Sequence, residues 1–393
     1  DAVFGVGLSR TIEGHYKDVI EEMNQIHAEK VAIDIPSGIS SFDGQVLGTA
    51  FHADLTVSFA CEKLGTVLFP GSDYAGEVIP VEIGIGTKLF EENPEVCYTL
   101  EKSDLSKFLP DRKKNSHKGS YGKILMITGS KGMSGAAYLS ARAAYISGGG
   151  LVQIYTEESN RTILQQLLPE AIVSTYTEYE EEKLQSLLKW ADVICIGCGL
   201  GKSRTAGQIL SYLMKYAEVP CVIDADGLNL LADHMELLPK EKKPFVLTPH
   251  MKEMAGLLGC TIPELGKNRF AALKEFTDSY GVVCVLKDAR TLVAGKDRQM
   301  FLNTAGNSAM AKAGSGDVLA GVITGLLAQH MKVYEGTVLG VYLHACGGDA
   351  ARERRGAYSV LAEDLTEGIA ACIKKTEKPS KKIFQWFFCV LHT

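Results

Sequence analysis

A glycine-rich segment that ends in a carboxylate leads directly into an apolar run. The segment is NTAGNSAMAKAGSGD, residues 303–317, and the run that follows it is VLAGVITGLLAQ. Apolar side chains recur in that run at helical spacing, which predicts a helix with one buried face that begins near Gly316. The free N–H groups of its first turn and the helix dipole favour a phosphate or a developing oxyanion. Gly314 and Gly316 carry no Cβ, so the backbone can approach such an anion closely.

Asp317 is the unusual residue of this segment, because a carboxylate repels a phosphate unless it has a task beside it. One task is to accept the proton of a hydroxyl that attacks a phosphoryl group. The alternative is that Asp317 only complements the positive end of the helix, as acidic residues in first turns often do. The local sequence leaves both interpretations open.

The elements expected to position this segment are short apolar runs that alternate with helix-length stretches. The runs are KILMIT, LVQIY, VICIG, CVIDAD, FVLTPH and VVCVLKD. Such a pattern is typical of a parallel sheet with helices on both faces, whose ligands bind beyond the carboxyl ends of the strands. Five polar or glycine-rich motifs follow these runs: GS (129–130), GCGLG (197–201), DADG (224–227), TPH (248–250) and KDART (287–291).

The composition of the whole chain favours a small-molecule ligand. With 393 residues and 46% hydrophobic residues, the chain is long enough for two domains with their own cores. A net charge of −6 and scattered lysines disfavour nucleic acid and anionic membranes as partners. No apolar run approaches the roughly 18 residues that a membrane span needs. The sequence begins with Asp rather than Met, so we expect a fragment or a processed product.

The ten cysteines predict a reducing compartment, the cytoplasm, rather than a disulfide framework. Several of them lie inside apolar runs such as VICIG and VVCVL. Cys195 and Cys198 form a CxxC motif, but no second pair lies at a zinc-like spacing, so we do not expect a metal there.

A smaller unit is expected to precede the larger one. The runs VAIDI (31–35), DLTVSFA (54–60) and EVIPVEI (77–83) resemble strands of a second α/β sheet, and the chain begins within another apolar run, DAVFGVGL. We therefore expect the first strands of this unit to be missing. The predicted organisation is a partial domain at 1–86, a linker at 87–110, the main domain at 111–376 and an atypical tail at 377–393.

Six blocks in the larger unit resemble a known family. They are NSHKGSYGKILMITGS (115–130), GCGLG, VIDADGLNLL (222–231), LTPHMKEMAGLL (247–258), VLKDART (285–291) and NTAGNSAMAKAGSGD. In this order they resemble the ADP/ATP-dependent NAD(P)H-hydrate dehydratases, over roughly residues 111–375. The resemblance implies a ribokinase-like three-layer αβα fold with a central, mostly parallel sheet.

The front unit resembles the second half of the NAD(P)H-hydrate epimerase domain, an isomerase with a Rossmann-like α/β fold. The resemblance rests on DAVFGVGLSR (1–10) and AIDIPSGI (32–39), and the family's earlier glycine-rich asparagine motif is absent. We therefore expect residues 1–86 to be an inactive remnant. The family pattern would make Asp1 and Ser37 ligands of K⁺ and would place residues 5–11 and Asp34 at the substrate; a turn-capping role for Asp34 stays open.

The resemblance of the larger unit implies a metabolite-repair reaction. NAD(P)HX is reduced nicotinamide dinucleotide damaged by addition of water. The dehydratase, a lyase, phosphorylates the 6-hydroxyl of the S epimer with ADP or ATP and then eliminates phosphate to restore NAD(P)H. Asp317 would be the base, the AGSGD backbone would hold the transferring phosphate, and Mg²⁺ would be carried by the nucleotide. Family resemblance also implies a homo-oligomer.

The same resemblance assigns further residues to the site. Ala136, Gly199 and His250 would line the hydrated dinucleotide. The nucleotide would be bordered by Lys287, Asp288, Ala289, Arg290, Thr291, Gly314, Ser315 and Gly316. Thr248-Pro249 resembles an N-cap and N1 pair, which would place His250 at a helix start. A purely capping or surface His250 and a solvent-directed Lys287 remain alternatives.

Two other functions use the same motifs. A ribokinase-type kinase of a sugar or vitamin alcohol would use the same anion site and base but release a stable phosphorylated product. A non-catalytic nucleotide-binding module would bind without turnover. The fate of the phosphate separates the first from a dehydratase, and absence of turnover would identify the second.

Overall fold

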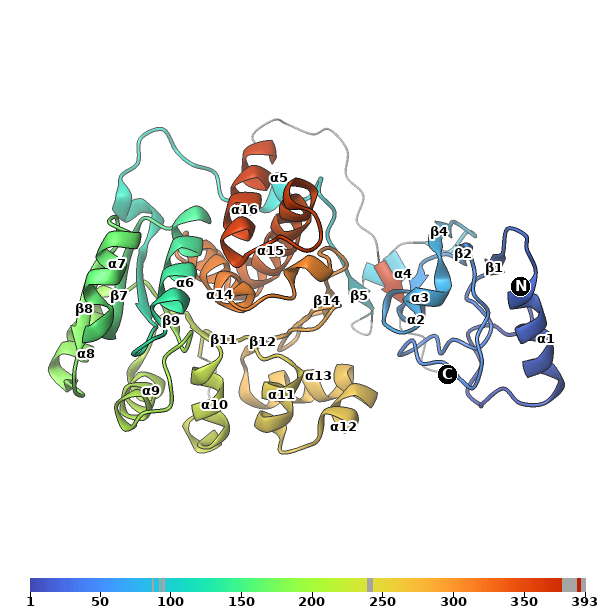
Figure 1. Cartoon of the computed structure of the whole chain (residues 1–393), viewed down its shortest axis with the longest axis horizontal. Coiled ribbons are helices and arrows are strands. Elements are labelled where there is room, and N and C mark those ends of the chain that lie inside the picture. The colour runs from blue at the N-terminus through green and yellow to red at the C-terminus, as the bar shows by residue number, and fades with distance from the viewer. Residues whose placement is uncertain (87, 92, 94–95, 239–242, 377–386, 390–393) are drawn as a thin grey trace. The chain divides into compact units, whose positions relative to one another are not determined.

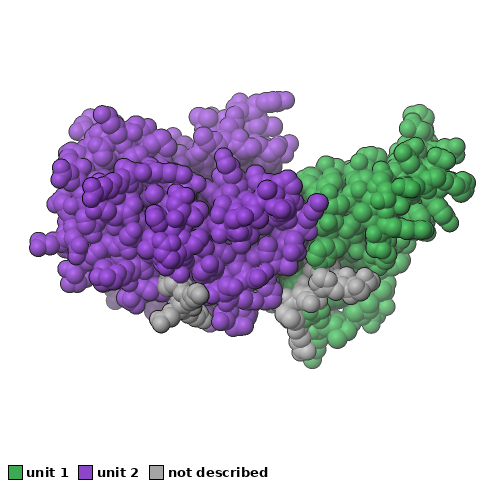
Figure 2. Space-filling view, turned by 90° about the horizontal axis from the view of Figure 1, so that it is seen from below, with its two compact units in different colours: residues 1–100, 298–304, 384–393 green, residues 101–297, 305–383 purple. Residues whose placement is uncertain are grey.

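The computed structural model divides into two compact units (Figure 2). It describes residues 1–376, except 87, 92, 94, 95 and 239–242, together with 387–389. Unit 1 comprises residues 1–100, 298–304 and 384–393, and unit 2 comprises 101–297 and 305–383. No helix in these described ranges combines the length and apolar character needed to cross a membrane.

Unit 2 is built on a mostly parallel sheet in the order β13-β12-β11-β10-β9-β6-β7-β8. All of its strands pair in parallel except β13, which is antiparallel to β12. The central strands are buried on both faces, which explains why they read as continuous Val, Ile and Cys runs. The strands are β6 (Lys123–Ile127), β7 (Leu151–Glu157), β8 (Ile172–Tyr176), β9 (Val193–Ile196), β10 (Cys221–Ile223), β11 (Phe245–Leu247), β12 (Val283–Leu286) and β13 (Leu292–Gly295).

Helices cover both faces of this sheet, which gives the three-layer αβα fold expected from the sequence (Figure 1). One face carries α6 (Ser134–Ile146), α14 (Ser315–Leu327), α15 (Val333–Arg355) and α16 (Ala362–Thr376). The other carries α9 (Arg204–Tyr216), α10 (Asp226–Ala232), α11 (Met251–Leu258), α12 (Ile262–Lys267) and α13 (Arg269–Tyr280). The remaining helices of unit 2 are α5 (Leu105–Phe108), α7 (Arg161–Leu167), α8 (Glu181–Trp190) and the 3₁₀ turns at Lys118–Tyr121, Glu158–Asn160, Met235–Leu237 and Ser308–Met310.

Helix α14 begins at Ser315, close to the predicted start, but the prediction of a single buried face is wrong. Every residue from Val318 to Leu327 is buried, because α6 and α15 both pack against the helix as well as the sheet. Glycines make this possible: a Cβ on Gly321 would lie 2.1 Å from the carbonyl oxygen of Ser140 in α6. A helix buried all round has its first turn held firmly at the sheet edge.

Unit 1 contains a parallel sheet of β1 (Val31–Ile33), β2 (Leu55–Phe59) and β4 (Glu77–Val81), at the three runs predicted to be strands. Its helices are α1 (His15–Gln25), α2 (Leu64–Val67), α3 (Ser72–Ala75) and α4 (Lys88–Glu91). A second set of short paired strands comprises β3 (Glu62–Lys63), β5 (Cys97–Tyr98), β14 (Phe301–Leu302) and β15 (Phe387–Cys389).

The segment expected to be a linker, 87–110, carries three of these elements: α4, β5 and α5. Residues 298–304 return to unit 1 through the pairing of β14 with β5, which no local pattern indicates. Of the tail predicted at 377–393, only β15 belongs to the described residues.

Candidate active site

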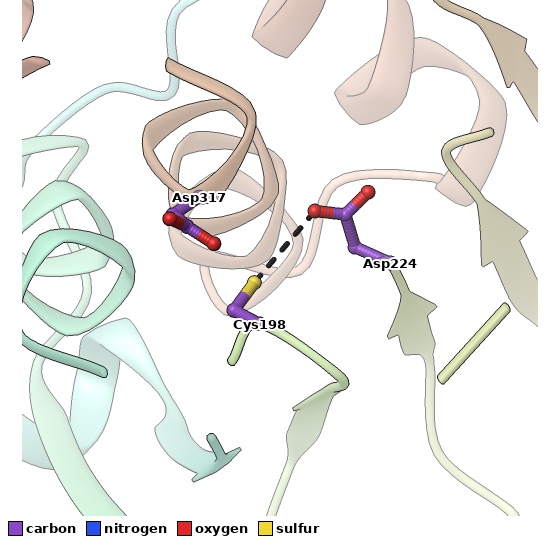
Figure 3. Close-up of side chains that lie close together, drawn as sticks. All are labelled: Cys198, Asp224 and Asp317. Carbon is purple, nitrogen blue, oxygen red and sulfur yellow. Dashed lines mark hydrogen bonds between the residues drawn. The ribbon is translucent and has the colours of Figure 1, made fainter. Parts of the chain in front are cut away.

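Four neighbouring strands of unit 2 deliver polar side chains to one edge of the sheet. Cys198, Asp224, Thr248 and Lys287 follow β9, β10, β11 and β12, which are adjacent and parallel. Their carboxyl ends therefore meet at the same edge, as expected for a ligand site in such a sheet. The first turn of α14 lies at this edge, and its Asp317 is drawn beside Cys198 and Asp224 in Figure 3.

The first turn of α14 is shaped for an anion. Its N-cap is Gly314, whose φ of +89° lies in the left-handed region that favours glycine. A Cβ on Gly316 would lie 3.6 Å from Lys287 Nζ and 3.9 Å from Asp224 Oδ2, so this backbone faces the polar cluster directly. The Lys287 ammonium thus lies at the positive end of α14, and both favour a phosphate there.

The surroundings of Asp317 favour uptake of a proton by its carboxylate. A carboxylate oxygen of Asp317, a carboxylate oxygen of Asp224 and the sulfur of Cys198 all lie within 4.8 Å of one another. Burial raises the pKa of Asp317 to about 6, with a further increase from the negative charge of Asp224; a hydrogen bond from Cys198 and the charge of Lys287 act in the opposite direction. A carboxylate with this pKa is mostly ionised at neutral pH yet accepts a proton more readily than an exposed one.

A buried ion pair holds the centre of the cluster together. Lys287 Nζ lies 2.7 Å from Asp224 Oδ1 and 3.9 Å from Glu253 Oε2, and the Thr248 hydroxyl donates to Asp224 Oδ1 at 2.7 Å. Burial disfavours the charge of Lys287, but the two carboxylates outweigh this, so its pKa is raised. The alternative of a solvent-directed lysine does not match this inward placement. Instead, Lys287 is a fixed positive charge at the first turn of α14.

His250 is placed differently from the prediction. Thr248 is not an N-cap; α11 begins at Met251 and His250 itself is the N-cap. His250 Nδ1 accepts from the Glu253 backbone N–H at 3.0 Å, and Glu253 Oε2 accepts from the His250 N–H at 2.8 Å. Because Nδ1 accepts a hydrogen bond, the proton of the neutral imidazole is on Nε2. The His250 side chain is 51% exposed. The histidine therefore caps the helix and still presents an N–H donor to solvent.

Ala136 and Gly199 are brought together, although they lie on different elements. Gly199 follows β9 with φ +60°, and a Cβ on it would lie only 2.7 Å from the Cβ of Ala136 near the start of α6. The absence of a side chain at Gly199 is therefore required both by the backbone conformation and by the close approach of α6.

The residues after Lys287 form the turn from β12 to β13. Asp288 accepts from Arg269 at 3.1 Å, and its backbone carbonyl accepts from the Thr291 hydroxyl at 3.1 Å. Ala289 and Arg290 complete the turn. Farther along, Ser315 Oγ lies 3.4 Å from Nε2 of the buried His344, whose pKa burial lowers to about 4. His344 is therefore a neutral neighbour of the anion site.

In unit 1 two of the predicted site residues, Asp1 and Ser37, are hydrogen-bonded to each other. Both carboxylate oxygens of Asp1 accept from Ser37, one from its N–H and one from its hydroxyl, each at 2.7 Å. Asp34 has φ +71°, accepts from the Phe59 N–H at 2.9 Å and forms an ion pair with the buried Lys63. These bonds give Asp34 a structural task at its turn.

Sequence reasoning placed the DADG motif at a strand end and read Thr248 only as a helix cap, and it did not single out Asp224 or Glu253. The available signal was a polar residue directly after each fully apolar run, because in-register parallel strands bring those positions together. Cys198 was considered only for a metal. Its pKa is raised by the neighbouring Cys195 thiol and by burial, so it is a neutral donor, and its thiol points to Asp224 Oδ2 at 3.8 Å (Figure 3).

Comparison with protein families agrees with both units. A family model described as NAD(P)H-hydrate dehydratase matches residues 124–371, and a model described as YjeF-related protein N-terminus matches residues 1–65. The bifunctional NAD(P)H-hydrate repair enzyme of Moorella thermoacetica is 36% identical over 98% of this chain and 74% of its own length. That of Escherichia coli is 34% identical over 93% of this chain and 69% of its own length.

Solved structures agree on the fold of unit 2. The ADP/ATP-dependent NAD(P)H-hydrate dehydratase of Bacillus subtilis, co-crystallised with ATP and Mg²⁺, has 30% identity and a TM-score of 0.61 over 70% of this chain and 97% of its own. A ribokinase-like protein of Enterococcus faecalis has 31% identity and a TM-score of 0.65 over 71% of this chain and 95% of its own. The chain belongs to the family of bifunctional NAD(P)H-hydrate repair enzymes.

Proposed function

We propose that unit 2 catalyses the ADP-dependent dehydration of (6S)-NAD(P)HX to NAD(P)H. The observation that carries this proposal is the placement of Asp317, a carboxylate with a pKa of about 6, on the same helix turn that faces Lys287. A base and an anion site this close suit phosphoryl transfer to a hydroxyl. Family membership supports the hydrated dinucleotide as the substrate.

The proposed reaction has two stages. Asp317 takes the proton of the 6-hydroxyl while that oxygen forms a bond to the terminal phosphorus of ADP, and AMP leaves. The C6–O bond then breaks, phosphate departs with the bonding electrons, and loss of a proton from the neighbouring ring carbon restores the double bond. Lys287 and the N–H groups of Gly314 and Gly316 would hold the phosphate. Mg²⁺ would supply further charge neutralisation on the nucleotide.

The direct test is the return of NADH absorbance when the chain is mixed with NADHX, Mg²⁺ and nucleotide. We expect ADP to support an initial rate at least equal to that with ATP at the same concentration, because the base and the anion site serve the terminal phosphoryl group of either donor. Phosphate that stays on the substrate would instead identify an ordinary kinase. No turnover with either nucleotide would identify a binding module.

His250 provides a separate test of the dinucleotide side. We propose that its Nε2–H donates to NAD(P)HX, so His250→Asn, which keeps an N-cap acceptor, should raise KM for NADHX roughly tenfold with little change in Tm. His250→Ala should raise KM similarly and also destabilise the fold by about 1 kcal/mol. The matched control is Thr261→Ala, which removes the capping box of α12 and should lower stability without changing KM. An unchanged KM in both histidine variants would leave His250 as a cap alone.

The remaining assignments are also proposals. Oxygen atoms of Asp1 and Ser37 would hold K⁺ in unit 1, since the structure already places these two groups in contact. We place the dehydratase domain at 111–376 and the protein in the cytoplasm. We also propose that the protein is a homo-oligomer, and a native mass measurement tests this oligomeric state. Nine cysteines of the described ranges, among them Cys195, Cys198 and Cys221, take part in no disulfide, which supports a reducing compartment.

A further inference from the structure

Asp224 is the most completely bonded side chain of the candidate site, yet the reaction described above gives it no role. Its side chain is only 2% exposed. Oδ1 accepts from Thr248 and Lys287, whereas Oδ2 faces the other way, 3.8 Å from the Cys198 thiol and 3.9 Å from the Cβ position of Gly316. One oxygen thus holds the lysine, and the other looks toward the helix turn that carries Asp317.

Lys287 lies on the same side of the cluster. Its Nζ is 3.6 Å from the Cβ position of Gly316, so both members of the ion pair border the first turn of α14. A lysine side chain has four rotatable carbons and would otherwise sample many positions. The fixed carboxylate of Asp224, itself braced by Thr248, is what aims the ammonium at this turn.

We propose that Asp224 is a positioning residue of the reaction: it aims the Lys287 ammonium at the anion site, and the two opposite charges together set the basicity of Asp317. This inference rests on the proposed function in taking Asp317 as the base. It goes beyond that function because it assigns a role to a residue that does not touch the substrate.

The signs of the effects follow from the charges around Asp317. Asp224 and Asp226 are negative neighbours and favour its protonated form, whereas Lys287 is positive and favours the ionised form. Cys198 is a neutral donor, and Glu253 and the neutral His344 reach the site through Lys287 and Ser315 respectively. In Asp224→Asn the amide oxygen can still accept from Lys287, and Glu253 lies 3.9 Å from its Nζ, so the ammonium stays in place while the negative charge is lost. This change should therefore lower the pKa of Asp317, and removing the charge of Lys287 should raise it.

The experiment is a pH titration of the Asp317 carboxyl carbon by NMR in the full chain labelled with ¹³C-aspartate, without substrate. The resonance is assigned by its loss in Asp317→Asn. We expect the midpoint to fall by about one pH unit or more in Asp224→Asn and to rise by a similar amount in Lys287→Met. The double variant, which removes both charges, should return close to the unsubstituted midpoint.

Asp192→Asn is the matched control, because Asp192 lies at the opposite edge of the same sheet, where it accepts from the Lys123 N–H. It should leave the midpoint unchanged. Equal midpoints in the unsubstituted chain, Asp224→Asn and Lys287→Met, or shifts of the same sign in the two single variants, would overturn the proposal. If Asp224→Asn does not fold, the direction of the Lys287→Met shift decides.

The pH dependence of turnover provides a second measurement beside the NMR titration. The acidic limb of kcat/KM for NADHX should move in the same direction as the NMR midpoint in each variant. A purely structural role would lower rates without moving this limb. If the NMR midpoints shift as expected but the chain never converts NADHX, the role of Asp224 and Lys287 in setting the pKa of Asp317 stands and the proposed function is contradicted. Failure of this proposal and failure of the proposed function can therefore be told apart.

Discussion

Asp317→Asn is expected to lower kcat for NADHX dehydration by roughly 10² to 10⁴, or about 3 to 5 kcal/mol in barrier, because it removes a positioned general base. The amide has nearly the same size as the carboxylate, so the anion site formed by Gly314 and Gly316 should persist. Affinity for ADP, measured by calorimetry, should therefore change little. Turnover close to that of the unsubstituted chain would contradict the assignment of Asp317 as the base.

The pH profile and the stability of this variant provide two further readouts. In the unsubstituted chain kcat/KM should fall below about pH 6, since protonation of Asp317 removes the base. The folded pKa lies above the unfolded value, so ionisation of Asp317 opposes folding, and this cost grows as pH rises from about 4 to 6 and persists at neutral pH. At pH 7 Asp317→Asn should consequently be more stable, by about 2 kcal/mol. A lower Tm would instead indicate structural damage.

Local patterns in the sequence were sufficient for the strands and for the start of α14. The apolar runs that end before Gly197, Asp224 and Lys287 all became strands of one sheet, since runs buried on both faces have few other places in an α/β fold. The start of α14 is similarly local, because a glycine in the left-handed region and a following apolar run determine it together.

Contacts between strands were not accessible in the same way. The Asp224–Lys287 pair joins residues 63 positions apart, and it depends on the order of β10, β11 and β12 across the sheet. His250 illustrates a subtler difficulty. Both Thr248 and His250 can accept a helix N–H; in the structure His250 caps α11, whereas the Thr248 hydroxyl donates to Asp224, a tertiary contact that local sequence does not indicate. The polar residues of the site were visible in the sequence, whereas their partners were not.

Gly197→Ala is expected to destabilise the fold strongly. Gly197 directly follows β9 and has φ +121°, and a Cβ there would lie 1.9 Å from the carbonyl oxygen of Asp224, a backbone atom that cannot move alone. The left-handed conformation and the steric overlap should together cost about 3 kcal/mol or more. Relief requires the ends of β9 and β10 to separate, which would displace Asp224 from Lys287, so activity should fall as well.

Gly207→Ala is the matched control for this variant, because Gly207 lies within α9 and a Cβ on it would meet no atom within 4 Å. Alanine in a helix interior should stabilise the chain by about 0.5 to 1 kcal/mol through the loss of backbone entropy in the unfolded state. Urea unfolding followed by tryptophan fluorescence measures both variants against the unsubstituted chain. The midpoint should drop for Gly197→Ala and rise slightly for Gly207→Ala. Equal midpoints would mean that the β9 and β10 ends tolerate a side chain between them, and that the close approach of these two strand ends is not what holds Asp224 beside Lys287.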